Sequence, residues 1–144
     1  MKKLVIYILF LFIQSCAMDY ACTSDIVNKS KKDVTIFIVY DRKKLDSIYN
    51  FKEENYLKHL QNLNEGSGLP FKFDTLTLTS QFTLTTNARL RVNFTAGGAN
   101  IIPNYSLINK IEIKDNESIK TYDHSSLDTL FKRINNAVWE FQIN

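Results

Sequence analysis

The chain is poor in the residues that build metal sites and disulfide scaffolds. Its 144 residues include two cysteines, two histidines, two prolines and four glycines. Two histidines and two cysteines are too few for the usual zinc-binding sets. The sequence also contains no phosphate-binding loop and no dinucleotide-binding fingerprint. We therefore expect neither a metal ion nor a cofactor.

The sequence also lacks a catalytic constellation. Asp123, His124 and Ser125 are triad residue types, but direct neighbours in sequence cannot adopt the geometry of a triad. The stretch from Gly66 to Gly68 lacks the spacing of a nucleophile elbow. His59 is a lone histidine without a partner in its segment. We therefore expect that the protein is not an enzyme; the alternative, a hydrolase, needs His59 or His124 to face a pocket that holds a nucleophile.

Long apolar runs are absent except at the start of the chain. A short positive start, Met1-Lys2-Lys3, precedes an apolar run of ten residues, Leu4–Ile13. This order of charge and apolar stretch is typical of a secretory signal. Ten helical residues span only about 15 Å, whereas a transmembrane helix needs about 20 residues. We therefore predict an exported protein with a signal peptide at residues 1–15.

The residues that end this run resemble a known processing site. Ile13-Gln14-Ser15-Cys16 is similar to the lipobox of bacterial lipoproteins, in the looser form found in the Bacteroidetes. The resemblance covers the first sixteen residues, and the mature domain resembles no family that we recognise. It implies cleavage before Cys16, a diacylglycerol thioether on the sulfur and acylation of the new amine, with palmitate as a typical chain. Two or more acyl chains hold a domain stably on a membrane, which implies a lipid-anchored protein of the cell envelope, in the outer membrane.

The two cysteines therefore have different expected roles. Cleavage after Ala17 is the alternative to lipidation, because Ser15 and Ala17 fit the small-x-small rule of ordinary secretion. If Cys16 is lipidated, Cys22 has no internal partner and no disulfide can form. We expect Cys22 to behave as a small buried hydrophobic residue.

The charge of the chain gives no basis for binding nucleic acid. Fourteen lysines and four arginines against 15 acidic residues give a net charge of +3, which falls to +1 when Lys2 and Lys3 leave with the signal. A near-neutral domain has no electrostatic attraction to nucleic acid or strong attraction to anionic lipid. The expected partners are the membrane, through the lipid anchor, and a protein or glycan of the envelope.

The rest of the chain has the length of one domain. We assign residues 16–24 to a lipid tether and linker and residues 25–144 to a single, mostly β domain. The segment Asp25–Tyr40 is predicted to form a β-hairpin with turn residues at its centre. Its second strand, Val34–Tyr40, is apolar on both faces and is therefore predicted to be central and covered twice.

Two short helices and further strands complete the predicted fold. Asn50 with Glu53 resembles a capping box and predicts a helix that Gly66 ends, while Ser125 with Asp128 predicts a second helix. Alternating residues predict three strands within 71–95, broken near Ser80 and at Thr86-Asn87, a hairpin across 108–122 and a last strand at 138–143. The predicted class is mainly β, a β-sandwich that includes the immunoglobulin-like arrangement, with two short helices; the alternative is an α+β domain.

Aromatic and hydroxyl residues supply the candidate sites. Trp139 alternates with Phe141 on the predicted last strand, so it is either a ligand platform or half of a core pair, and Tyr105 is a second candidate ligand contact. Three triplets of acid, hydroxyl and apolar residue resemble the acceptors of O-glycosylation in exported Bacteroidetes proteins, with the hydroxyls at Ser47, Thr75 and Thr129.

These features together predict a lipid-anchored, non-catalytic protein of the cell envelope that acts as a binding or structural module. A carbohydrate-binding or inhibitor-like module is the alternative, and an exposed aromatic strip that includes Trp139 and Tyr105 would favour it. A hydrolase is the third function considered.

Overall fold

The computed structural model describes residues 20–97 and 101–144. The predicted signal peptide at residues 1–15 and the predicted lipidation site Cys16 lie outside the described residues.

Two sheets form the framework of the domain. One sheet has four strands in the order β5 (Arg89–Gly97), β1 (Tyr20–Asn28), β9 (Val138–Ile143) and β8 (Lys132–Arg133). The other has five strands in the order β3 (Phe71–Asp74), β4 (Thr79–Leu84), β2 (Val34–Tyr40), β6 (Ile108–Lys114) and β7 (Ile119–Asp123). The described residues also form three helices, α2 (Arg42–Ile48), α3 (Glu53–Glu65) and α4 (His124–Leu130). The predicted mainly β fold with two sheets is confirmed.

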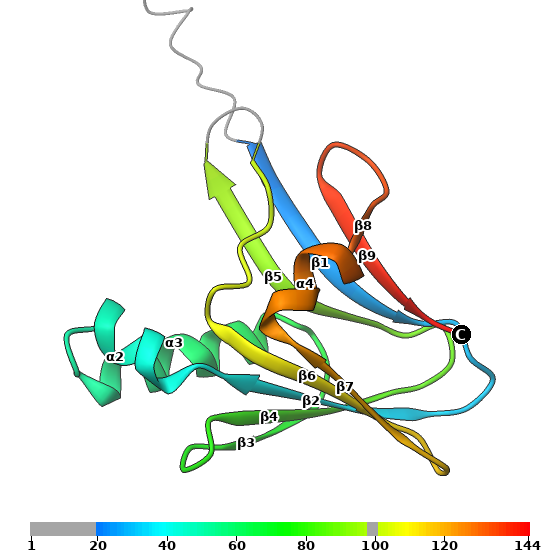
Figure 1. The fold of residues 1–144 in the computed structure, drawn as a ribbon, viewed down its shortest axis with the longest axis horizontal. Coiled ribbons are helices and arrows are strands. Elements are labelled where there is room, and N and C mark those ends of the chain that lie inside the picture. Colours follow the sequence, from blue (N-terminus) through cyan, green and yellow to red (C-terminus); the bar gives the residue numbers. More distant parts are fainter. Residues whose placement is uncertain (1–19, 98–100) are drawn as a thin grey trace, which may run out of the picture.

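The two sheets enclose one core. Figure 1 shows them close together near the C-terminus and diverging toward the other end, with their strands at an oblique angle. Buried side chains from both sheets, such as Ile26, Ile36 and Leu90, belong to the same hydrophobic cluster. Leu60 of α3 and Leu127 of α4 are also fully buried in that cluster. Each such side chain contributes about 1.5–3 kcal/mol of hydrophobic free energy when it is buried.

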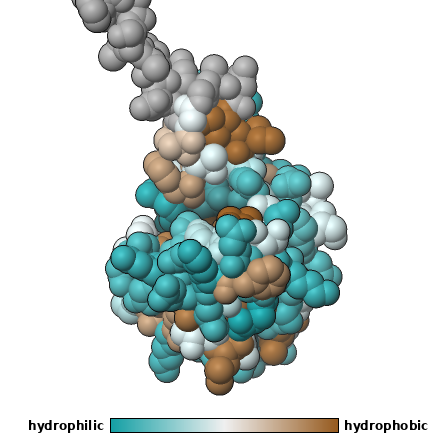
Figure 2. All heavy atoms as spheres, turned by 90° about the vertical axis from the view of Figure 1, so that its left-hand side faces the viewer, coloured by the Kyte–Doolittle hydropathy of each residue, from teal (hydrophilic) through white to brown (hydrophobic). Residues whose placement is uncertain are grey.

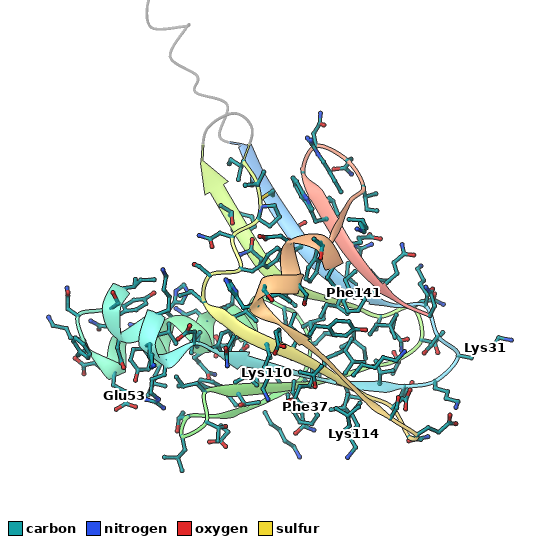
Figure 3. All side chains as sticks on the ribbon, in the orientation of Figure 1. Lys31, Phe37, Glu53, Lys110, Lys114 and Phe141 are labelled. Atoms are coloured by element: carbon teal, nitrogen blue, oxygen red, sulfur yellow. The ribbon has the colours of Figure 1, made fainter. Side chains whose placement is uncertain are left out.

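Strand β2 lies in the middle of the five-stranded sheet, as predicted. Its side chains alternate along the strand, so that Val34, Ile36 and Ile38 are buried in the core. The prediction that β2 is covered on both faces is wrong. Phe37 and Val39 on the other face are only half-buried, and Figure 3 shows Phe37 on the side of the sheet away from Phe141.

The hairpin predicted for Asp25–Tyr40 is also wrong. Strands β1 and β2 lie in different sheets, and residues 29–33 carry the chain from one sheet to the other. Strand β1 pairs antiparallel with β5 and parallel with β9 instead. The parallel pair distinguishes this sheet from the two antiparallel sheets of an immunoglobulin domain.

The boundary predicted between linker and domain lies too late in the chain. Strand β1 begins at Tyr20, whereas residues 16–24 had the composition of a linker. Cys22 and Ser24 are buried, with exposed fractions of 1% and 0%. Polar residues such as Thr23 and Ser24 conceal the strand because they carry no apolar alternation.

The helices differ from the prediction in number and in their caps. Helix α2 was not expected, although Asp41 caps it by accepting a hydrogen bond from the Lys44 backbone N–H at 3.0 Å. Helix α3 ends before Gly66 as predicted, but its N-cap residue is Lys52. Asn50 cannot cap it because its backbone is left-handed, with φ at 50°. Helix α4 is likewise preceded by Asp123, so that Ser125 lies inside the helix.

The strands in the second half of the chain follow the prediction closely. The hairpin of β6 and β7 and the last strand β9 are confirmed. The break expected near Ser80 lies earlier, at residues 75–78, because the Asp74 carboxylate accepts hydrogen bonds from the Leu76 and Thr77 backbone and closes a turn there. Leu76 is consequently 86% exposed, whereas Leu78 is buried.

Candidate functional site

The two aromatic residues predicted to contact a ligand line one hollow in the molecule. We call it the aromatic hollow; its volume is about 740 Å³. It lies between the end of β5, the segment before β6, the start of α4 and β9. Its lining consists of Thr95, Ile102, Pro103, Asn104, Tyr105, Ser106, His124, Asp128 and Trp139.

Most of the surface of both aromatic rings is buried against neighbouring side chains. The Tyr105 ring is 4% exposed and stacks on Phe131 with 4.9 Å between the ring centroids. Its hydroxyl is hydrogen-bonded to that of Ser24 at 2.7 Å, and burial raises the pKa of Tyr105 to about 12. Trp139 is half-buried, and the Arg133 guanidinium lies 5.4 Å from its ring centroid. Ligand contact by these two residues stays a prediction.

The two histidines lie on different helices, and both are exposed. His59 is exposed on α3, and its ring centroid is 5.8 Å from that of Tyr49. His124 lines the aromatic hollow, and its Nδ1 lies 3.0 Å from the Ile108 carbonyl oxygen. In the part of the chain that is described, no hydrogen bond joins either histidine to a hydroxyl or thiol. The described residues therefore place no nucleophile beside either histidine, and the third function considered, a hydrolase, stays a prediction.

The predicted glycosylation sites and Cys22 occupy opposite environments. Ser47 on α2, Thr75 in the turn after β3 and Thr129 on α4 are all exposed to solvent. Their modification stays a prediction. Cys22 is a free, buried cysteine, and burial raises the pKa of its thiol. The expectation of a small buried hydrophobic residue is confirmed.

A second hollow lies at the end of the molecule where the two sheets converge. We call it the lysine hollow; its volume is about 600 Å³. Three segments that are distant in sequence surround it, the β1–β2 connection, the β6–β7 hairpin and the end of β9. Its lining consists of Lys29, Ser30, Lys31, Lys32, Val34, Ile113, Asp115, Ser118, Lys120, Tyr122, Phe141, Gln142, Ile143 and Asn144.

The backbone that carries three of these lysines is held in place by a buried amide. The side-chain nitrogen of Asn28, a residue with 0% exposure, donates hydrogen bonds to the carbonyl oxygens of Lys32 at 2.8 Å and Leu84 at 3.0 Å. Its side-chain oxygen accepts hydrogen bonds from the backbone and the hydroxyl of Ser30. The Lys29 N–H donates to Ile143 of β9 at 2.8 Å. The connection is therefore fixed to both sheets before any ligand arrives.

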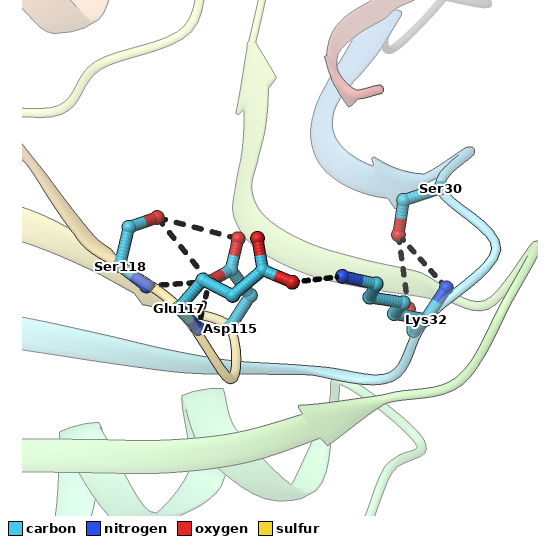
Figure 4. A network of polar contacts seen from close by, with 5 residues as sticks. All are labelled: Ser30, Lys32, Asp115, Glu117 and Ser118. Carbon is cyan, nitrogen blue, oxygen red and sulfur yellow. Dashed lines mark hydrogen bonds and ion pairs between the residues drawn. The ribbon is translucent and has the colours of Figure 1, made fainter.

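The opposite wall of the lysine hollow is an ordered hairpin turn. The Asp115 carboxylate accepts hydrogen bonds from the backbone N–H groups of Glu117 at 2.8 Å and Ser118 at 2.7 Å. These bonds lower the pKa of Asp115. Lys32 forms an ion pair with Glu117 at 2.6 Å and so joins the hairpin to the β1–β2 connection, as Figure 4 shows.

Positive charge predominates on the rim of this hollow, and apolar side chains form its floor. Four lysines and one acidic residue, Asp115, belong to the lining that is described. Lys120 shares the inward face of β7 with Tyr122, whose ring meets that of Phe141 edge-on at 5.2 Å. Lys31 at the tip of the connection extends into solvent (Figure 3). The arrangement can bind an anionic group whose body rests on the aromatic floor.

The sequence contained a signal for this site, which was interpreted only as a turn. The run Lys29-Ser30-Lys31-Lys32 concentrates three positive charges in four residues. Its partner Lys120 and the floor residue Phe141 lie far away in the sequence, so only the folded chain brings the lysines and the floor together.

The described residues offer no metal site and no membrane span. They hold no group of three or more His, Cys, Asp or Glu side chains placed to bind a metal ion. Residues 20–97 and 101–144 likewise contain no helix that is long and apolar enough to cross a bilayer. Comparison of the chain with protein-family models, curated proteins and solved structures finds no match.

Proposed function

We propose that this chain is a lipid-anchored, non-catalytic binding module of the bacterial cell envelope, and that the lysine hollow binds its ligand. The lipid anchor rests on Cys16 and the lipobox-like residues before it. The ligand site rests on one observation, the four lysines above an apolar floor at the convergent end of the sandwich. The ligand that fits is an organic anion, a carboxylate or phosphate group carried on a ring or an apolar body.

Electrostatics favours this hollow over the rest of the surface. The mature chain has a net charge of only +1, so the overall field does not attract anions. The lysine hollow concentrates positive charge locally, and only Lys32 among its lysines forms an ion pair with another described residue. Lysine ammonium groups serve as point charges for carboxylate or phosphate. A fixed backbone reduces the ordering that accompanies binding.

The test is a titration of the mature domain with anionic and neutral probes. We expect an oligogalacturonate to bind, inorganic phosphate to bind more weakly because it lacks a ring, and a neutral oligogalactose not to bind. The triple change Lys29→Gln, Lys31→Gln and Lys120→Gln should weaken oligogalacturonate binding on the order of tenfold, equivalent to about 1.4 kcal/mol. Calorimetry at increasing salt measures the affinity, which should fall as the charges are screened.

The matched control removes three other exposed lysines. The control protein carries Lys43→Gln and Lys44→Gln on α2 and Lys58→Gln on α3. These three substitutions cause the same change in net charge. This control should bind the probe as the unchanged domain does. Equal weakening in both triple variants, or no binding of either anion by the unchanged domain, would refute the lysine hollow as the ligand site.

A carbohydrate-binding or inhibitor-like module remains a second candidate, because Tyr105 and Trp139 line the same hollow. Trp139 is the only tryptophan of the chain. A change in its fluorescence on addition of a neutral oligosaccharide would assign the ligand to the aromatic hollow instead.

A further inference from the structure

Of the seven large exposed apolar side chains among the described residues, six form two groups, and the seventh, Ile119 at the start of β7, is 61% exposed. Three of them are Phe94 with 56% exposure, Ile102 with 72% and Ile134 with 54%. Another three, Ile48, Phe51 and Leu76, have exposed fractions of 51%, 79% and 86%. Figure 2 shows hydrophobic surface at both the upper and the lower end of the face in view, with hydrophilic side chains between them.

The first three residues lie where the chain enters the fold. Phe94 is paired with Thr23 of β1, and Gly97 of the same strand is paired with Tyr20. The side chain of Ile101, next to Ile102, lies 3.4 Å from the position that a Cβ on Gly97 would occupy. Ile134 donates its backbone N–H to Val138, whose strand partner is also Thr23. We call this the tether-proximal end; Figure 1 shows the start of β1, the end of β5 and the β8–β9 turn there.

We propose that the tether-proximal end docks on the lipid bilayer, with Phe94, Ile102 and Ile134 in the membrane interface. The inference rests on the proposed lipid anchor at Cys16. Tyr20 lies four positions after Cys16, and even a fully extended chain spans only about 14 Å over that length. Strand β1 has nine residues and is about 30 Å long. The tether is thus shorter than the domain, so the start of β1 stays close to the bilayer.

The short tether keeps the start of β1 near the bilayer, and the chemistry of the surface there favours the orientation in which the tether-proximal end faces the membrane. Apolar side chains gain free energy when they leave water for the acyl boundary. Lys132 and Arg133 on β8 are exposed at the same end and can meet anionic headgroups. Arg133 lies over Trp139, and tryptophan and basic residues are the usual side chains of the membrane interface. The lysine hollow, at the other end of β1, would then face away from the membrane.

The test places one tryptophan at each apolar group. In a Trp139→Phe background, Phe94→Trp marks the tether-proximal end, and Phe51→Trp is the matched control at the second group. Both proteins are purified in their lipidated form and inserted into vesicles of phosphatidylethanolamine and phosphatidylglycerol, in which part of the phosphatidylethanolamine carries brominated acyl chains. We expect bromine to quench the fluorescence of Phe94→Trp at least severalfold more than that of Phe51→Trp.

A second pair of variants tests the pose by removing apolar surface. Phe94→Asn, Ile102→Asn and Ile134→Asn together should expose vesicle-bound protein to faster proteolysis near β1, whereas Ile48→Asn, Phe51→Asn and Leu76→Asn should not. Equal, weak quenching at both tryptophan positions in protein that floats with the vesicles would overturn docking and leave the lipid anchor intact. Protein that neither incorporates palmitate nor floats would overturn the anchor, and with it this inference.

Discussion

At the scale of single residues, a buried carboxylate joins neighbouring strands of the four-stranded sheet. Asp25 is only 2% exposed. Its carboxylate forms an ion pair with the Arg89 guanidinium of β5 at 2.7 Å, and the same guanidinium also pairs with Glu140 of β9. Three strands are thus joined on one face of the four-stranded sheet. The sequence could not reveal this network, because Asp25 looked like the polar start of a hairpin and its partners are distant in the chain. Breaking a buried pair leaves an uncompensated charge.

Two buried tyrosines make the stability of the domain sensitive to alkali. Burial raises the pKa of Tyr40 from 10.0 to about 12 and that of Tyr105 to the same value. The folded state therefore favours the neutral phenol. This contribution is fully present below pH 10, the pKa of the unfolded chain, and is lost as the pH rises through 12. A shift of two units corresponds to at most about 2.7 kcal/mol for each group.

Replacing one of these tyrosines should separate its two effects. Tyr40→Phe removes the hydrogen bond from the hydroxyl to Asn64 Oδ1 at 3.1 Å, so the free energy of unfolding at neutral pH should fall by about 1 kcal/mol. Between pH 10 and 12 the variant should lose less stability than the unchanged domain. Urea unfolding across this pH range measures both effects, with Tyr49→Phe as the control for loss of a hydroxyl. A variant with an unchanged alkaline profile would contradict the prediction.

At the scale of elements, the local patterns identified most strands and helices but not their partners. Gly66 at the end of α3 and the alternating residues of β9 predicted the ends or the extent of these two elements correctly. Helix α2 has a single buried residue, Leu45, so it shows no stripe. Strands β1 and β2 were predicted to pair because a polar turn separates them. Turn residues indicate a reversal, and whether the next strand joins the same sheet depends on contacts with distant segments.

The candidate site shows the same limit. The sequence indicates which residues carry positive charge or an aromatic ring, such as Lys31 and Trp139. It cannot indicate that Lys120 and Phe141 complete the lysine hollow, because their spacing has no local consequence. The sequence indicated more of the aromatic hollow. Tyr105 and Trp139 were both candidate ligand contacts, and the fold brings both to one hollow.

The last strand is predicted to be indispensable for folding. Strand β9 pairs with β1 over six residues and with β8 on its other side, and Phe141 is buried in the core. Deletion from Ala137 onward leaves the inner edge of β1 unpaired and removes that side chain. The truncated protein should be insoluble or rapidly digested by protease. Removal of Asn144 alone, which is exposed, is the control, and equal thermal melting of both shortened proteins would contradict the expectation.

At the scale of the whole molecule, the proposed anchor and the proposed ligand site lie at opposite ends of β1. The strand begins at Tyr20, close to Cys16, and ends at Asn28, which holds the β1–β2 connection of the lysine hollow. One strand therefore links the proposed membrane end to the proposed ligand end. A domain attached by so short a tether cannot turn the lysine hollow toward its own membrane without detaching the apolar residues of the tether-proximal end.

If the proposed lipid anchor holds the protein, its localisation is expected to depend on Cys16 alone. The described residues contain no membrane-spanning helix, and the near-neutral mature chain offers no polybasic anchor. Cys22 cannot substitute for Cys16, because it is 1% exposed inside β1. In the proposed pose the apolar side chains at the tether-proximal end orient the domain, but three partly inserted residues give far less affinity than several acyl chains, each worth about 0.8 kcal/mol per buried methylene.

Cys16→Ser should therefore leave an uncleaved precursor or a soluble exported domain, without incorporated lipid. Cys22→Ser is the matched control; it should keep both palmitate label and membrane location, because a buried thiol in the core carries no acyl chain. Metabolic labelling with palmitate followed by membrane fractionation measures both properties in each variant. Label that persists in Cys16→Ser, or unchanged protein recovered free of the membrane, would show that the domain is held by something other than a lipid on Cys16.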